Sequence, residues 1–257
     1  MENLPSNAQL DRLGDRLRLA DDPPADDLRL LQLFRSAHAP ALVVVEDALE
    51  DLGFSPTSRT KTPETIVDKL KRETTRLTSI QDIVGVRIVP DVMLDGQDAA
   101  VARVTARLGG KVYDRREKPT HGYRAVHVVV RVLERRVEVQ VRTPLQHLWA
   151  EVMERIADRF GRGIRYGVLP LDATRRDVVQ DVLGLSADIA EHEKLRTEVD
   201  RLQREIAAIE MPSNLSEHEV AALAAHRRLK AQLDADEISF RQALRVIRDA
   251  LEGSGSA

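Results

Sequence analysis

Hydrophobic residues near the start of the chain recur with the spacing of helices. Leucines occupy one helical face within the first 20 residues. Two further helices are predicted over residues 25–37 and 40–52, because prolines fit the start of each segment and Gly53 fits the end of the second. Residues 1–53 are therefore predicted to form an N-terminal helical cap.

From residue 54 onward the pattern changes to a mixture of helices and strands. Thr62 and Pro63 predict the start of a helix that continues through Leu77, and helical spacing recurs over residues 97–108. Strands are predicted over residues 83–90, 111–114, 124–133 and 137–143. We expect an α+β core over residues 54–170, with a mixed, mostly antiparallel sheet of about five strands flanked by helices.

The last part of the chain is predicted to be helical again. Apolar residues follow a four-three rhythm from residue 195, the segment 211–214 interrupts it, and Ser216 with Glu219 predicts a capping box for a second helix. Residues 171–252 are thus predicted to form a helical hairpin that packs on the core or on a second subunit, which makes a homo-oligomer the expected assembly. A flexible tail is predicted over residues 253–257.

Composition and charge narrow the kinds of site that the chain can hold. Its 257 residues include no cysteine, so disulfides and thiolate metal sites are excluded. The amino terminus lacks an apolar run, and we expect a cytoplasmic protein without a membrane partner. Residues 55–142 hold 18 Lys and Arg against 11 Asp and Glu, although the whole chain has a net charge of -3. This basic middle indicates an anion held centrally.

Two predicted strands carry charged side chains. In the segment 137–143, valines alternate with Glu138, Gln140 and Arg142, so these three are expected on one strand face. A carboxylate, an amide and a guanidinium in a row could hold a metal ion and a phosphate, although an ordinary half-exposed strand shows the same alternation. Asp82 lies at the mouth of the strand at 83–90 and Arg87 within it, where charges need partners.

Basic side chains also surround the start of the helix predicted at residue 63. Arg59 and Lys61 stand just before the helix, where free backbone N–H groups and the helix dipole favour an anion. Thr65 and Lys69 are four residues apart and share one face of its first turns. Together they predict a phosphate cradle; the alternative is a capped amphipathic helix with its lysines in solvent.

A basic loop precedes the strand predicted at 124–133. It contains Lys118, His121 and Gly122, and Tyr123 follows directly. An aromatic ring beside cationic groups suits a stacked base with nearby phosphates, although a tyrosine packed on the sheet edge is the alternative. Tyr123 and His127 are an even number of residues apart and are therefore expected on the same strand face.

These motifs occur in one order along the chain: Arg59-x-Lys61, Thr65, Lys69, Asp82 with Arg87, Gly122-Tyr123-Arg124-x-x-His127, Glu138-x-Gln140-x-Arg142-Thr143, and His147-x-Trp149-Ala150-Glu151. The ordered set resembles the RelA/SpoT synthetase domain over roughly residues 40–170, and several motifs in one order are harder to reach by accident than one. The His-Asp pair of the family's hydrolase half does not occur in the sequence. The resemblance is therefore to the short, synthetase-only members, the small alarmone synthetases and their toxic relatives.

The resemblance implies an ATP-dependent pyrophosphokinase that transfers the β,γ-diphosphate of ATP to the 3'-hydroxyl of GDP or GTP, makes (p)ppGpp and releases AMP. It assigns ATP binding to Arg59, Lys61, Thr65, Lys69 and Arg87, with the two arginines on the adenine. It assigns Mg²⁺ binding to Asp82 and Glu138, with Glu138 also as the candidate base. It assigns acceptor binding to Tyr123 with Lys118, His121, Arg124 and His127, and supporting roles to Gln140, Arg142 and His147.

The acceptor side departs from the family pattern. His121 stands where the family usually has a short polar residue, and the lysine of this loop is displaced to Lys118. Because the donor side matches, use of ATP is the firmer expectation, whereas the acceptor stays open. The alternatives are a toxic relative that modifies the 3'-CCA end of tRNA or adenine nucleotides, with an antitoxin as partner, and a catalytically silent module that binds a nucleotide or a partner.

Overall fold

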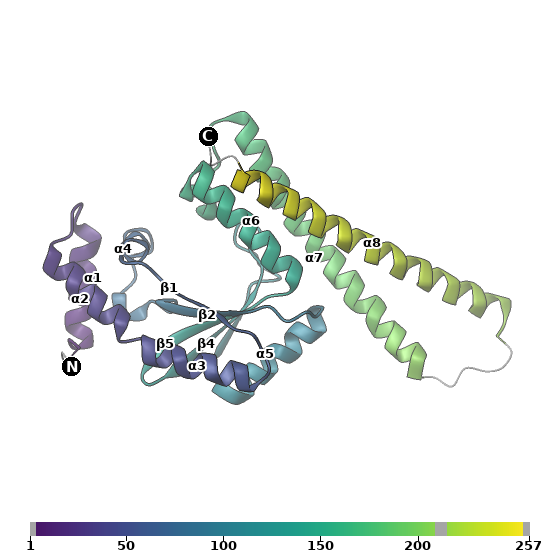
Figure 1. The fold of residues 1–257 in the computed structure, drawn as a ribbon, viewed down its shortest axis with the longest axis horizontal. Coiled ribbons are helices and arrows are strands. Elements are labelled where there is room, and N and C mark those ends of the chain that lie inside the picture. The colour runs from purple at the N-terminus through teal and green to yellow at the C-terminus, as the bar shows by residue number, and fades with distance from the viewer. Residues whose placement is uncertain (1–3, 209–214, 254–257) are drawn as a thin grey trace. The chain divides into compact units, whose positions relative to one another are not determined.

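The computed structural model describes residues 4–208 and 215–253 of the chain (Figure 1). The chain divides into two compact units. The first, called here the sheet unit, comprises residues 1–89, 100–113 and 126–141. The second, called the helical unit, comprises residues 90–99, 114–125 and 142–257. Each unit buries its own cluster of hydrophobic side chains.

The sheet unit begins with the three helices that the sequence predicts, α1 (Asn7–Leu19), α2 (Ala25–Ser36) and α3 (Ala39–Asp51). Within the described residues, one segment, Ala25–Asp51, is long and apolar enough to cross a membrane by length and composition. It consists of α2 and α3, and its Leu31, Phe34 and Val45 lie in the core of the sheet unit. Some of the apolar side chains of this segment are therefore part of the core.

The sheet has five strands: β1 (Thr57–Thr60), β2 (Val84–Ile88), β3 (Lys111–Asp114), β4 (Val126–Val132) and β5 (Arg135–Val141). Their order is β1-β2-β5-β4-β3. The pairs β1–β2 and β4–β5 are antiparallel, whereas β2 and β5 are parallel. The predicted fold class, a mixed sheet flanked by helices, is confirmed.

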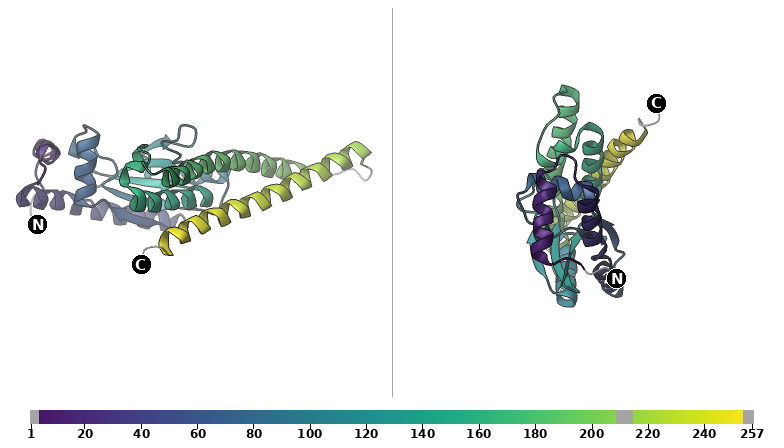
Figure 2. Two further views of the ribbon diagram at one scale, coloured as in Figure 1. Left: turned by 90° about the horizontal axis from the view of Figure 1, so that it is seen from above. Right: turned by 90° about the vertical axis from the view of Figure 1, so that its left-hand side faces the viewer.

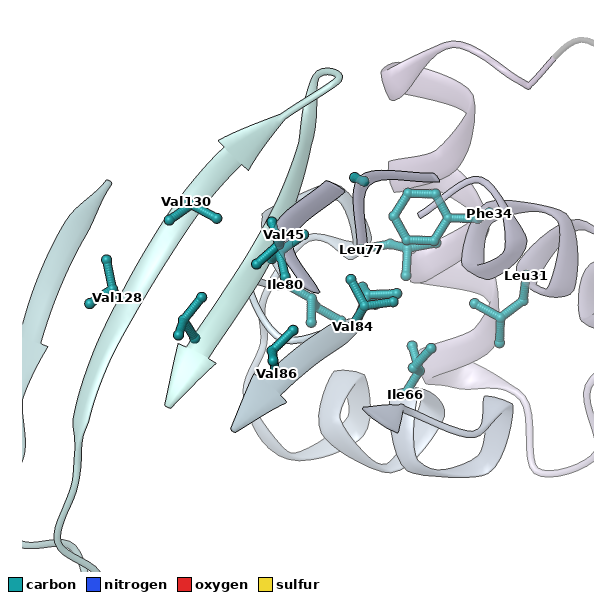
Figure 3. Packing of buried hydrophobic residues seen from close by; sticks show 14 of the residues in the cluster. Leu31, Phe34, Val45, Ile66, Leu77, Ile80, Val84, Val86, Val128 and Val130 are labelled. Atoms are coloured by element: carbon teal, nitrogen blue, oxygen red, sulfur yellow. The ribbon is translucent and has the colours of Figure 1, made fainter. Parts of the chain in front are cut away.

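One face of the sheet supplies the core of the sheet unit. The valines of β2 and β5 alternate onto this face, and Val84, Val86, Val137 and Val139 are each at most 1% exposed. Helix α3 packs on both strands, and Figure 3 shows how the valines of β2 lie among buried side chains of the surrounding helices. Each fully buried valine or leucine contributes roughly 1.5–3 kcal/mol, so this packing fixes which residues face the other way.

The helix predicted to continue through Leu77 is shorter than expected. Helix α4 (Pro63–Arg72) starts as predicted, with Thr62 as N-cap and Pro63 in the first turn, but Leu77 lies in the separate 3₁₀ helix η1 (Leu77–Ser79). Arg18 of α1 donates to the carbonyl oxygens of Leu70 and Thr75 at 3.1 and 2.6 Å. It thereby satisfies carbonyl groups at the end of α4 that a longer helix would have bonded itself.

The strand predicted at 137–143 ends two residues earlier, at Val141. Thr143 is instead the N-cap of α6 (Pro144–Phe160) and forms a capping box with Gln146. Because this cap opens a helix, Arg142 lies just after the strand, and the predicted strand end at residue 143 is wrong.

Two other boundaries differ from the prediction. Strand β4 begins at Val126, so Tyr123 lies in the turn before it and the alternation that was to place it with His127 does not apply. Helix α5 (Leu94–Leu108) begins earlier than the predicted 97. Strand β1 was not located by the sequence, because its four exposed residues, Thr57–Thr60, carry no alternation of apolar and polar side chains.

The helical unit contains α6, the 3₁₀ helix η2 (Arg162–Tyr166), α7 (Ala173–Ala208) and α8 (Glu217–Gly253). Helices α7 and α8 pack side by side as the predicted hairpin (Figure 2). The backbone N–H of Ser216 donates to Glu219 Oε2 at 2.7 Å and its hydroxyl accepts from Glu219 N at 3.3 Å, which is the predicted capping box. The predicted interruption at 211–214 and the tail residues 254–257 lie outside the described residues.

Candidate functional site

The second face of the sheet gathers predicted site residues. Pairing of β1 with β2 and of β2 with β5 places Arg59 opposite Gly85 and Gly85 opposite Glu138, and it places Arg87 opposite Gln140. Since paired residues point to the same side of a sheet, both arginines share the face of Glu138 and Gln140. The valines that face the core leave no other orientation for these four positions.

Asp82 precedes β2 and lies between two lysines. Lys61 Nζ is 3.0 Å from Asp82 Oδ2, and Lys69 Nζ is 3.0 Å from Asp82 Oδ1. Burial alone raises the pKa of a carboxyl group, and the nearby Glu138 raises it further, but the charges of Lys61 and Lys69 outweigh both effects and lower the pKa of Asp82. The predicted metal ligand is therefore ionised, and both of its oxygens face cations.

Glu138 is buried on β5, with partners on both of its oxygens. Oε1 lies 2.9 Å from His127 Nδ1, and Oε2 accepts a hydrogen bond from Gln140 Nε2 at 2.7 Å. Burial raises its pKa, but the hydrogen bond and charge interaction with His127, the bond from Gln140 and the charge of Lys61 together lower the pKa to about 2. Lys61 thus acts on both carboxylates, and the six residues Lys61, Lys69, Asp82, His127, Glu138 and Gln140 form one group, called here the carboxylate cluster.

The position of His127 differs from the expectation. It was predicted on the acceptor side with Tyr123, but it is buried on β4, opposite Gln140, and contacts Glu138. Sequence alternation within one strand could not show this pairing, because it depends on the register between β4 and β5.

The depressed pKa of Glu138 predicts a specific loss of stability in acid. The folded-state value of about 2 lies below the ordinary 4.5, so the ionised group stabilises the fold above pH 4.5 and this contribution is lost as the pH falls toward 2. The measurement is the free energy of unfolding in urea, with EDTA present. Between about pH 6 and about pH 3, we expect this free energy to fall by about 2 kcal/mol more in the wild type than in Glu138→Gln. Equal losses in both proteins would contradict the pairing described here.

The start of α4 is capped as predicted. Thr62 caps the helix by accepting from Thr65 N at 3.4 Å, and the Thr65 hydroxyl donates to Thr62 O at 2.9 Å. Lys69 lies one turn further along, where it contacts Asp82. The free N–H groups of the first turn, the two hydroxyls and Lys61 therefore lie at the start of α4, whereas Lys69 belongs to its last turn and reaches Asp82 from there.

Predicted acceptor residues lie in the helical unit. Arg142 Nη2 donates to the Tyr123 hydroxyl at 3.0 Å, and the guanidinium carbon of Arg142 lies 5.0 Å from the centroid of the Tyr123 ring. Arg142 is only 3% exposed. A buried guanidinium against an aromatic face fixes the orientation of the ring.

The other predicted acceptor residues have mixed surroundings. Lys118 and His121 are exposed, and His121 has a positive φ of 49°. Arg124 is committed to the protein, because its Nε donates to Ser186 Oγ at 3.3 Å and its Nη1 donates to the carbonyl of Arg116. His147 Nε2 lies 3.3 Å from Glu151 Oε1 on the same helix.

Ser186 and Glu193 on α7 were missed by the sequence analysis although both contact this region. Ser186 donates to the carbonyl of Gly122, and Glu193 accepts from Thr143 and Gln146. The available signal was weak: a serine and a glutamate at buried positions of a long helix, with no motif around them.

The carboxylate cluster suits a magnesium ion by the chemistry of its oxygens. Among the described residues, no group of three or more His, Cys, Asp and Glu could hold a metal ion. Asp82 and Glu138 offer two carboxylates that interact electrostatically, and magnesium commonly takes one or two carboxylates together with substrate phosphates and water. The residues present therefore fit magnesium that arrives with a nucleotide.

Comparison with known proteins identifies the family of the chain. A family described as "Region found in RelA / SpoT proteins" matches residues 58–157. Two uncharacterized proteins, Rv1366 of Mycobacterium tuberculosis and Mb1401 of Mycobacterium bovis, are each 39% identical over 206 residues, which cover 73% of this chain and 74% of the relative.

Solved structures with a similar fold are more distant in sequence. Small alarmone synthetase 1 from Bacillus subtilis is 21% identical, with a TM-score of 0.46, over 67% of this chain and 97% of that one. The same enzyme bound to AMPCPP is 18% identical, with a TM-score of 0.48, over 70% of this chain and 100% of that one. The structure of the complex between the Type VI effector Tas1 and its immunity protein gives 14% identity, with a TM-score of 0.42, over 73% of this chain and 98% of that one. The family match spans the carboxylate cluster and Tyr123, and the chain therefore belongs to the RelA/SpoT synthetase-domain family.

Proposed function

We propose that this protein is a pyrophosphokinase that transfers the β,γ-diphosphate of ATP to the 3'-hydroxyl of GDP or GTP. The observation that carries this proposal is the carboxylate cluster, in which two ionised carboxylates share Lys61 on the sheet face of a RelA/SpoT-family chain. In the reaction, a bond forms between the 3'-oxygen and the β-phosphorus, the α,β-bridging bond breaks, and AMP leaves with the bridging oxygen.

The donor nucleotide has a matching set of groups in the sheet unit. Lys61, Lys69 and the first turn of α4 would bind the phosphates of ATP, because the two lysines converge on Asp82 and the first turn has free N–H groups. Arg59 and Arg87 lie on the same sheet face and would hold the adenine between them. Phosphoryl-type transfer depends mainly on such positioning and on charge neutralisation.

Asp82 and Glu138 would hold magnesium. When bound, the ion neutralises charge on the phosphate oxygens. In the free protein, Lys61 and Lys69 balance the two carboxylates. The cluster therefore needs no metal for its own charge balance, and we expect tight metal binding only together with ATP.

Glu138 would accept the proton of the acceptor hydroxyl. A carboxylate with a pKa of about 2 is a weak base, and general bases work best when their pKa lies nearer the working pH. Lys61 contributes to this low pKa. Contact of the Lys61 ammonium with the ATP phosphates would weaken this contribution, whereas a magnesium ion held by Glu138 would favour its ionised form.

Tyr123 would stack on the acceptor base, with its ring held by Arg142. Stacking alone is tolerant of base identity, and the exposed His121 and Lys118 are the side chains left to discriminate. The geometry therefore supports a nucleotide acceptor, and guanosine nucleotides are the class proposed here by family membership.

A parallel labelling experiment tests the proposal. Purified protein with magnesium and γ-labelled ATP is offered GDP, GTP, additional ATP, or bulk tRNA with and without its terminal adenosine. We expect label in the products of GDP or GTP and release of AMP only when the acceptor is present. Label in tRNA or in adenine nucleotides alone would replace the guanosine acceptor, and no label in any product would refute the enzymatic proposal.

A further inference from the structure

Helix α7 lies outside the family region of residues 58–157, yet it supports the loop that carries Tyr123. The loop, residues 114–125, belongs to the same compact unit as α6 and α7. Two buried polar residues of α7 are involved: Ser186 contacts the loop, and Glu193 contacts the start of α6. Burying a polar side chain costs free energy unless the side chain is hydrogen-bonded. The fold is therefore stabilised when the hydrogen-bond partners of these two residues stay in place.

Ser186 fixes the backbone immediately before Tyr123. Its hydroxyl donates to the carbonyl oxygen of Gly122 at 2.5 Å and accepts from Arg124 Nε at 3.3 Å. Ser186 is 3% exposed. One hydroxyl thus holds the residues on both sides of Tyr123.

The surroundings of Gly122 make this contact tight. Gly122 has a φ of 79°, and a β-carbon there would lie 2.7 Å from the Trp149 ring and 3.2 Å from Leu183 of α7. Trp149 is itself fixed, because its indole N–H donates to the carbonyl of Val182 at 2.6 Å. The loop backbone is therefore packed directly against α6 and α7.

Glu193 fixes the start of α6, one residue after Arg142. The Thr143 hydroxyl donates to Glu193 Oε1, and Gln146 Nε2 donates to Oε2 at 3.0 Å. Thr143 and Gln146 are the two members of the capping box of α6. Glu193 is 2% exposed, and burial raises its pKa in spite of these two hydrogen bonds.

A chain of amides extends from Glu193 back to the loop. Gln146 accepts from Gln97 Nε2 at 2.9 Å, and Gln97 Oε1 accepts from Arg116 Nη1 at 3.2 Å. A cavity of about 180 Å³ lies beside this chain, and Arg116, Arg124, Gln146 and Glu193 are among its lining residues. Glu193 therefore borders a space that loop residues also line, and Ser186 reaches the same loop through its contact with Arg124.

We infer that Ser186 and Glu193 are positioning residues for the acceptor nucleotide. Ser186 sets the backbone on either side of Tyr123, and Glu193 sets the helix start that follows Arg142, so together they fix both members of the Tyr123–Arg142 pair. This inference rests on the proposed function, since it assigns acceptor binding to that pair. The long C-terminal helix is on this basis part of the acceptor site.

Steady-state kinetics of Ser186→Ala and Glu193→Ala test the consequence for binding. We expect each change to raise the KM for the acceptor about tenfold, because a buried polar partner is left unmatched, and to change the KM for ATP less than twofold. Glu193→Gln should recover only part of the acceptor affinity lost in Glu193→Ala, since the amide keeps the shape of the side chain but replaces one of the two acceptor oxygens with a donor. Ser239→Ala on α8 and Glu198→Ala on the exposed side of α7 are the matched controls.

Hydrogen exchange of the substrate-free protein tests the positioning itself and needs no activity. We expect faster amide exchange in residues 115–125 for Ser186→Ala and in the first turn of α6 for Glu193→Ala, with no change for the two controls. If the wild type labels no acceptor, the proposed function fails, and exchange still decides whether α7 orders the loop. Unchanged exchange in both variants, or equal rises in the KM for ATP and for the acceptor, would overturn the inference.

Discussion

Glu138→Gln is expected to lower the rate of diphosphate transfer by at least about a hundredfold, the scale on which one electrostatic group contributes to a transition state. The substitution keeps the shape of the side chain but removes the charge that faces His127 and Lys61. It also removes one of the two carboxylates proposed to bind magnesium. The measurement is single-turnover transfer from labelled ATP to the acceptor identified by the parallel assay.

The matched control is Glu134→Gln, because Glu134 is an exposed glutamate in the turn between β4 and β5. It should retain wild-type turnover, and circular dichroism should show that both variants are folded. Wild-type transfer by a folded Glu138→Gln protein would remove Glu138 from the chemistry.

Lys61→Gln is expected to weaken use of ATP more than use of the acceptor. Lys61 is 3.0 Å from Asp82 and also lowers the pKa of Glu138. Its loss therefore removes a charge that is proposed to bind phosphate, and it removes a positive charge beside both carboxylates. We expect kcat/KM for ATP to fall about a hundredfold, in line with the loss of one charged contact in a shielded site, while the KM for the acceptor stays within about threefold.

Lys71→Gln on α4 controls for the change in net charge, because Lys71 is exposed. Full initial-rate grids in both substrates separate the two KM values. If only the KM for the acceptor rises, Lys61 acts on the acceptor and not on ATP. That result would contradict the proposed division between donor-binding and acceptor-binding residues.

Local patterns predicted the parts of the fold that depend on neighbouring residues. The alternation around Glu138 and Gln140, the cap at Thr62 and the capping box at Ser216 are properties of a few consecutive residues, and the structure contains all of them. The error at Arg142 arose where two local signals competed, since the Thr143 cap of a helix prevailed over two more residues of strand.

Features that depend on distant parts of the chain could not be predicted in this way. His127 meets Glu138 only through the register of two strands. Ser186 contacts Gly122 across 64 residues, and Glu193 contacts Thr143 across 50. Strand β1 is fully exposed and polar, so pairing with β2 is what makes it a strand. None of these partners leaves a periodic signal in the sequence.

The crowding at Gly122 limits how the proposed acceptor loop could change over evolution. A side chain at this position would displace an indole ring that is itself anchored, whereas His121 and Lys118 are exposed. Substitutions at these two exposed positions are therefore compatible with the fold, and a library randomised at 118 and 121 should yield many folded clones. Position 122 offers almost no such freedom.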